Sequence, residues 1–246
     1  MNAMKIDRER CTGCEACYPY CPVQAIGKAE WDGRTVSLIS QEECVECGVC
    51  FRSGVCPTGA FYLPALAWPR TIRAIFSNPM SSHTSTNVRG RGTNEMKTND
   101  VTGRYTRGFT GVLIEMGRPG IGTTFRELQT VWMCLTRLKV EFEPKNPVTG
   151  LIVDRELGKI KEDILDEKVL SAIIEFTIEN DRLKEVLQTI KAVSRAIGTV
   201  FSLSLISRLD EDEDTPVVAM AQEAGFPVRP NTKVNFGLGR PLKEGA

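Results

Sequence analysis

The chain has 246 residues, and its 31 lysines and arginines balance its 31 aspartates and glutamates, so the formal net charge is zero. This balance excludes a strongly basic nucleic-acid-binding protein and a protein with an acidic tail. With 41% hydrophobic and 25% charged residues, the composition is that of a soluble globular protein, long enough for two domains of ~100 to 200 residues each.

The zero net charge is an average over three segments. Residues 1–63 carry 6 basic and 8 acidic side chains, residues 64–118 carry 8 and 3, and residues 119–246 carry 17 and 20. A basic middle segment therefore lies between two acidic ends. No apolar run approaches the ~18 residues that span a bilayer, and the N-terminus has no apolar signal region. We therefore expect a cytoplasmic protein that contacts neither a membrane nor nucleic acid.

Eight of the nine cysteines form two patterned sets near the N-terminus. The first set reads C-x2-C-x2-C-x3-C-P, and the second has two more residues before its last cysteine. The sets are Cys11, Cys14, Cys17 and Cys21, and Cys44, Cys47, Cys50 and Cys56. Without an export signal, metal binding is favoured over disulfides. Three thiolates spaced by three residues can converge on one iron-sulfur cube, whereas structural zinc sites, the alternative, usually combine two C-x2-C pairs.

Over residues 4–63 this pattern resembles the bacterial ferredoxins that carry two [4Fe-4S] clusters. The resemblance implies a pseudo-twofold fold with two short helices and small hairpins. It also implies that each fourth cysteine crosses to the other set. One cluster would be held by Cys11, Cys14, Cys17 and Cys56, and the other by Cys44, Cys47, Cys50 and Cys21.

The residues between the cysteines suit such clusters. Gly13 and Gly48 permit positive φ, so that backbone N–H groups can approach cluster sulfurs. We expect apolar side chains to sheathe the clusters, namely Ile6, Val23, Ile26, Val49, Phe51, Val55 and Phe61. Clusters whose irons are all bound by thiolates have no open position, so the expected chemistry is single-electron transfer.

Residues 64–107 form a basic segment rich in Ser, Thr, Asn, Gly and Arg, which predicts a linker with little regular structure. A short amphipathic helix is predicted from Thr71 to Ser77. The functional interpretation is an anion or partner contact, and the alternative is a solvated crossing segment. The cations assigned to this contact, two of them from repeated Gly-Arg-Pro triplets, are Arg89, Arg91, Lys97, Arg104, Arg107, Arg118 and Arg240. His83, the only histidine, is expected to be a polar loop residue.

Residues 108–246 alternate between strand and helix patterns. Strands are predicted at 111–116, 140–143, 168–178 and 199–207, long helices at 124–138 and 181–197, and a further short helix at 216–223. Asp181 and Gly198 are the expected caps of the second long helix. The order β-α-β-β-α-β predicts an α+β ferredoxin-like plait, similar to the ACT-type domains that bind small ligands or pair through sheet edges. Such pairing would make the protein a homo-oligomer.

Three functions follow from these patterns. The leading hypothesis is an electron-transfer subunit of a larger cytoplasmic oxidoreductase of anaerobic metabolism, with partner subunits that include a flavoprotein. The first alternative is a self-contained reductase, because residues 90–100 are similar to iron-sulfur reductases of the 6-hydroxynicotinate reductase type. No dinucleotide-binding fingerprint supports it, and no catalytic residue can be named. The second alternative is a redox-linked metabolite sensor.

Overall fold

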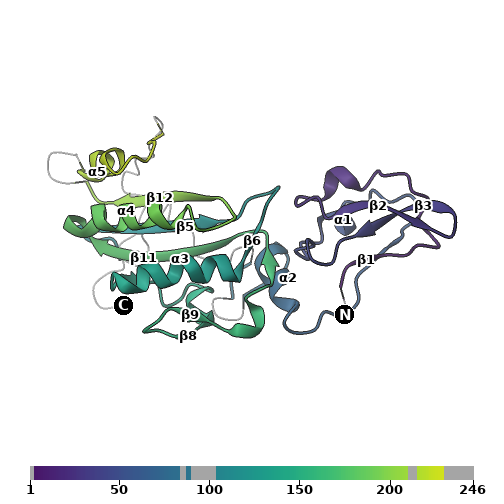
Figure 1. Cartoon of the computed structure of the whole chain (residues 1–246), viewed down its shortest axis with the longest axis horizontal. Helices are drawn as coiled ribbons and strands as arrows, with labels where there is room; N and C mark the ends of the chain where they lie inside the picture. Colours follow the sequence, from purple (N-terminus) through teal and green to yellow (C-terminus); the bar gives the residue numbers. More distant parts are fainter. Residues whose placement is uncertain (1–2, 84–86, 90–103, 210–214, 230–246) are drawn as a thin grey trace.

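The computed structural model describes residues 3–83, 87–89, 104–209 and 215–229. A small N-terminal domain and a larger C-terminal domain lie side by side along the longest axis, with helix α2 between them (Figure 1). Arg91, Lys97 and Arg240 lie outside the described residues. The same holds for residues 90–100, on which the predicted resemblance to reductases depends, and for the acidic run 210–214. None of the helices in the described ranges combines the length and the apolar character needed to cross a membrane.

The N-terminal domain is built from two short antiparallel strand pairs. Strand β1 (Lys5–Ile6) pairs with β4 (Phe61–Tyr62), and β2 (Ile26–Trp31) forms a hairpin with β3 (Arg34–Ile39). The expected two short helices are a 3-10 helix, η1 (Tyr18–Tyr20), and α1 (Val49–Arg52). Pairing of β1 with β4 closes the domain, because it joins the residues before the first cysteine to those after the last one.

Helix α2 (Thr71–Ser77) has the predicted bounds and connects the two domains. Ile72 and Phe76 are buried in the C-terminal core. The Phe76 ring meets the rings of His83 and Phe125 edge to face, with centroids 4.6 Å and 5.3 Å apart. His83 lies in a loop, as expected from sequence, and its side chain is only 2% exposed because it packs on an aromatic ring.

The C-terminal domain contains a four-stranded antiparallel sheet with the order β12-β5-β11-β7. The strands are β5 (Phe109–Met116), β7 (Glu141–Phe142), β11 (Ala172–Glu179) and β12 (Phe201–Ser207). The long helices are α3 (Phe125–Arg137) and α4 (Leu183–Val193), whose apolar faces share one core with β5 and β11. Thr124 begins α3 with a capping box to Glu127.

Two predicted elements differ from the structure. The predicted strand 168–178 is divided into β10 (Lys168–Val169), which pairs with β6 (Thr123–Thr124), and β11 in the main sheet. The second long helix is shorter than predicted, because Asp181 lies in a 3-10 turn, η4 (Asn180–Arg182), and α4 ends with Ser194 as its C-cap rather than Gly198. Bonds from Arg195 and Ala196 to carbonyls three residues back tighten the chain beyond that point.

The insertion between β7 and β10 folds as a hairpin of β8 (Ile152–Asp154) and β9 (Lys159–Ile160). Two 3-10 helices flank it, η2 (Thr149–Leu151) and η3 (Glu162–Ile164). The predicted short helix after the sheet is α5 (Val217–Glu223). Cys134, the ninth cysteine, lies in α3 and packs partly buried against the core.

The central strands β5 and β11 are buried on both faces, not only on the side of the helices. Leu113 and Ile173 lie on the second face, with Glu115 and Glu175 beside them, and all four are at most 4% exposed. Tyr105, which precedes β5, is only 1% exposed and its ring lies against Gly111. Glycine is required at this position of β5 because a Cβ atom there would overlap the ring.

Substitution of Gly111 by Ala tests this packing. The added methyl must displace the Tyr105 ring, so we expect a loss of about 1–3 kcal/mol of unfolding free energy, the usual cost of overpacking. The matched control is Gly150→Ala, because a Cβ at Gly150 meets no atom within 4 Å. Thermal unfolding followed by circular dichroism measures both variants, and equal midpoints for the two would contradict the packing role of Tyr105.

Candidate iron-sulfur centres

Four cysteines from both halves of the N-terminal domain line one cavity. Cys44 and Cys47 come from the loop that enters α1, Cys50 lies in α1 itself, and Cys21 comes from the end of the first cysteine motif. Met4, Val23 and Val45 contribute apolar walls. The structure thus brings together the four thiols that the ferredoxin resemblance assigns to one cluster. We call them the interface set, because this cavity lies on the side of the C-terminal domain.

Burial dominates the chemistry of the interface set. It raises the pKa of the Cys44 thiol to about 12, with the negative charge of Glu46 adding to the effect, and it raises the pKa of Cys50 to about 12 with the other thiols adding. The pKa of Cys47 is also raised, chiefly by burial. Without metal these thiols keep their protons at neutral pH, so metal binding there must release protons.

The remaining motif cysteines, Cys11, Cys14, Cys17 and Cys56, are called the outer set. Cys11 and Cys17 are buried, whereas Cys14 is exposed. The backbone N–H of Ser37 in β3 donates to the Cys11 sulfur at 3.3 Å. Burial raises the pKa of Cys17, the Ser37 hydroxyl lowers it, and the nearby thiols Cys11 and Cys14 raise it further. These interactions gather three thiols of the outer set beside β3.

The fourth cysteines of the two motifs have equivalent surroundings. The sulfur of Cys21 accepts a backbone N–H from Ala25 at 3.1 Å, and the sulfur of Cys56 accepts one from Ala60 at 3.3 Å. Burial raises the pKa of Cys56, but hydrogen bonds from the Thr58 hydroxyl and from nearby backbone N–H groups outweigh it, and the pKa is lowered. Such donors stabilise a thiolate, the form that binds iron.

The turn that carries Cys56 lies against the loop that leads to Cys11. Arg10 donates to the Thr58 carbonyl at 2.7 Å, and the backbone N–H of Asp7 donates to the Ala60 carbonyl at 2.8 Å. These bonds hold the residues before Cys11 against the residues after Cys56, beside the pairing of β1 with β4. The assignment of Cys56 to the outer set stays a prediction, and these contacts support it.

The ligand loops depend on two glycines with φ of +69°, as expected. A Cβ on Gly13 would overlap the carbonyl oxygen of Thr35, and one on Gly48 would lie 2.6 Å from a guanidinium nitrogen of Arg52. Most of the expected sheath is buried or partly buried in the N-terminal core, but Phe51 is 48% exposed. Its position on the outer side of the one-turn helix α1 turns the ring towards solvent.

Sequence reasoning missed the arginines that bind the backbone of the ligand loops. Arg34 donates to the Cys11 carbonyl, Arg52 to the Cys47 carbonyl and Arg73 to the Cys44 carbonyl, each at 2.9 Å. A spacing motif cannot reveal them, because each guanidinium reaches a carbonyl rather than a recognisable side-chain partner.

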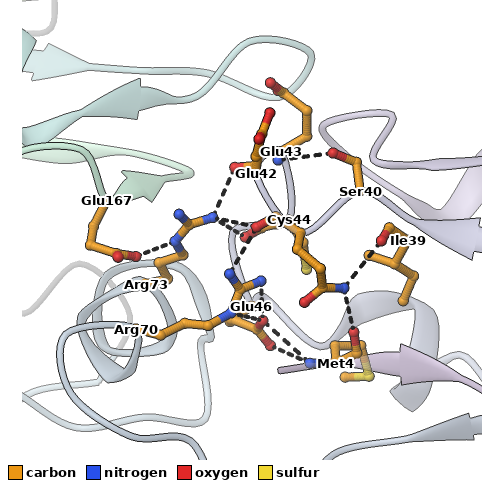
Figure 2. A network of polar contacts seen from close by, with 11 residues as sticks. Met4, Ile39, Ser40, Glu42, Glu43, Cys44, Glu46, Arg70, Arg73 and Glu167 are labelled. Carbon is orange, nitrogen blue, oxygen red and sulfur yellow. Dashed lines mark hydrogen bonds and ion pairs between the residues drawn. The ribbon is translucent and has the colours of Figure 1, made fainter. Parts of the chain in front are cut away.

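Glu46 is a second missed residue and lies between two cysteines of the interface set. It is 3% exposed, and Arg70 donates to its carboxylate at 2.7 Å (Figure 2). The backbone N–H of Met4 also points to both carboxylate oxygens. A buried carboxylate is stable only with such partners, so Glu46 binds α2 and β1 to the ligand loop.

Of the cations predicted to contact an anion or partner, the structure describes Arg89, Arg104, Arg107 and Arg118. Arg89 and Arg107 are exposed, whereas Arg104 forms an ion pair with Glu143 beyond β7. Arg118 donates to the Glu115 carboxylate at 2.9 Å, to the Gly117 carbonyl at 2.8 Å and to the Ser202 hydroxyl. Arg104 and Arg118 thus use their donors within the C-terminal domain. The anion or partner contact stays a prediction.

Comparison with known proteins agrees with this geometry. Residues 3–63 match the family described as 4Fe-4S dicluster domain. Ferredoxin-3 of Rhodobacter capsulatus is 33% identical over 76 residues, which cover 22% of this chain and 73% of that protein. Ferredoxin-1 of Rhodobacter capsulatus strain ATCC BAA-309 is 44% identical over 45 residues, which cover 18% of this chain and 63% of that protein. The N-terminal domain therefore binds [4Fe-4S] clusters.

The surroundings of the interface set suit an iron-sulfur cluster. Its four cysteines surround a cavity, and the backbone N–H of Ala25 points at the Cys21 sulfur, as N–H groups do around iron-sulfur clusters.

Substitution of Gly13 by Ala tests the outer ligand loop. We expect the wild-type protein to contain about eight irons per chain and the variant to lose about half of them, because the new methyl displaces the loop from Thr35. Gly33→Ala is the matched control, since Gly33 has a φ of +71° but a Cβ there meets nothing within 4 Å. Iron analysis after anaerobic purification compares them. Equal iron in both variants would mean that this contact does not matter.

The buried thiols predict how the stability of the metal-free protein depends on pH. Cys44 and Cys50 keep their protons in the folded state up to a pH of about 12, whereas an ordinary thiol has a pKa of 9.0. The folded state thus binds more protons between these values. Stability is complete below pH 9 and falls as the pH rises towards 12. Urea unfolding at a series of pH values measures this fall in the free energy of unfolding. The fall should be smaller in Cys44→Ala, and the same dependence on pH in both proteins would contradict the burial argument.

Proposed function

The chain belongs, through its N-terminal domain, to the ferredoxins with a 4Fe-4S dicluster domain. From this premise we propose that it is an electron-transfer subunit of a larger cytoplasmic oxidoreductase of anaerobic metabolism. In this proposal the outer set and the interface set each hold one [4Fe-4S] cluster. The partner subunits would include a flavoprotein. A bound cluster supplies one-electron redox chemistry, and the side chains around it bind it and exclude water.

The position of the two cysteine sets is the observation that carries the proposal. The outer set contains the exposed Cys14, so a donor protein can approach it from solvent. The interface set lies where the two domains meet. The backbone N–H of Gly120 donates to the carbonyl of Pro22, next to Cys21, and Lys168 forms an ion pair with Glu43, next to Cys44. The N-terminal domain thus presents the outer set to solvent and the interface set to the C-terminal domain.

We assign the residues around the interface set two roles. Val23, Ile26 and Val45 line the cavity and keep water away from the thiolates, which lowers the local dielectric constant. The backbone N–H of Ala25 stabilises negative charge on the Cys21 sulfur. Leu170 of the C-terminal domain packs against the same core, so protein covers the core on the side of the C-terminal domain.

We further propose that the C-terminal domain is a ferredoxin-like plait that serves as the docking or ligand platform. The order β12-β5-β11-β7 supports this proposal, because the first and third strands in sequence order are central and both long helices share one core with the sheet. In the part of the chain that the structure describes, β12 and β7 are the outer strands of the sheet. We propose that a second copy of the chain pairs with one of them, which gives the homo-oligomer expected from sequence.

Reductive titration tests the proposed electron transfer. Anaerobically purified protein should take up two electrons per chain from dithionite, give the electron paramagnetic resonance (EPR) spectrum of reduced [4Fe-4S] clusters, and pass the electrons to added cytochrome c. We expect Cys14→Ala to take up about one electron, because the outer set then lacks a ligand. Cys134→Ala is the control and should take up two, since this thiol packs against the C-terminal core. Bound zinc without visible absorption would contradict the proposal.

A further inference from the structure

Two buried arginines beside the interface set have no role in the function proposed above. Arg70 is the N-cap residue of α2 and Arg73 lies in its first turn, and they are only 7% and 6% exposed. Charged side chains are rarely buried to this degree unless they are paired. Both arginines donate to the loop of residues 41–47, which carries two cysteines of the interface set (Figure 2).

Arg73 makes the denser set of contacts. One terminal nitrogen donates to the carbonyls of Gln41, Glu42 and Cys44 at 3.1, 2.8 and 2.9 Å. Its Nε atom forms a hydrogen-bonded ion pair with Glu167, which immediately precedes β10 in the C-terminal domain. A single guanidinium therefore touches the backbone of a cysteine ligand on one side and the C-terminal domain on the other.

The two arginines differ in where their counter-charge lies. The charge of Arg70 is balanced by Glu46 inside the ligand loop, so this pair moves with the cluster site. The charge of Arg73 is balanced by Glu167, which belongs to the other domain. The net charge that Arg73 presents to the interface set therefore depends on how close Glu167 is.

A buried cation beside a redox group favours the form with more negative charge. Reduction adds one electron, and the attraction to a guanidinium is strong where water and salt ions are excluded. We propose that Arg73 sets the reduction potential of the cluster held by the interface set, and that Glu167 opposes it, so that the C-terminal domain controls this potential. Arg73 is thus a positioning and charge-setting residue. The inference rests on the proposed function, which assigns that cluster to Cys21, Cys44, Cys47 and Cys50.

Redox titration monitored by EPR, which resolves the two clusters of the full chain, tests the inference. Arg73→Gln keeps hydrogen-bonding capacity but removes the charge. It should lower the equilibrium constant for reduction of one cluster about tenfold, or about 59 mV for one electron. Glu167→Gln should shift the same cluster to a more positive potential. Arg73→Lys keeps the charge and should leave the potential near that of the wild type, even where stability falls.

Two controls separate a local effect from a general one. Arg34→Gln removes a cation from the Cys11 carbonyl and should shift only the other cluster. Lys184→Gln removes an exposed cation that pairs with Glu223 on the far helices, and should shift neither. If Arg73→Lys behaved like Arg73→Gln, the residue would be structural only, and the inference would be overturned.

The test also separates this inference from the proposed function. Unchanged potentials in both Arg73→Gln and Glu167→Gln, with about eight irons retained, would overturn the inference and leave electron transfer intact. If Arg73→Gln fails to assemble a cluster, Glu167→Gln decides, because it retains the guanidinium and its three carbonyl contacts. Absence of iron from the anaerobically purified wild-type protein would contradict the proposed function itself.

Discussion

Glu46 holds a carboxylate almost out of contact with water, in the same loop that presents Cys44 and Cys47. Iron binding adds thiolate charge to this loop, so the region concentrates negative charge in a medium of low dielectric constant. Cations must compensate for it, and the loop itself supplies none. Arg70 and Arg73 of α2 meet this need, which is why a segment beyond the ferredoxin repeat packs beside the cysteines.

The domain interface follows from that charge compensation. Once α2 is fixed by Arg70, its apolar residues Ile72 and Phe76 can only face the C-terminal core, where they are buried. Glu167, which precedes β10, then pairs with Arg73 of α2, and Lys168 at the start of β10 pairs with Glu43 of the ligand loop. Removing one partner of a buried ion pair commonly costs about 3–5 kcal/mol, so these few contacts give the two domains a defined relation.

The local patterns of the sequence predicted the two cysteine sets, the positive φ of Gly13 and Gly48, the bounds of α2 and, to within one residue at each end, those of α3. Each depends on residues that are close in sequence, such as a thiolate spacing or an apolar face. The arginine network was not predictable in this way, because Arg73 and Glu167 are 94 positions apart. The shortened α4 and the division into β10 and β11 also depend on tertiary packing, which propensity does not contain.

Position on the sheet shows which partners one of the predicted contact cations has within the fold. Arg118 beside a glycine turn suggested an anion site, and its donors bind Glu115, Gly117 and Ser202 across adjacent strands. Arg118 thus compensates the charge of Glu115, a buried acid on the second face of the sheet. A charge count along the chain cannot distinguish a cation that pairs with an acid of its own domain from a cation that is open to a partner.

The burial of Arg70 and Arg73 limits how far the N-terminal domain can be treated as an interchangeable module. Replacement by another ferredoxin would keep the cluster but would leave both guanidinium groups against a foreign loop. That loop would need an acid at the position of Glu46 and carbonyls at those of Gln41, Glu42 and Cys44. Lineages that recombine such domains would therefore have to exchange α2 together with the cysteine motifs, as one inherited unit.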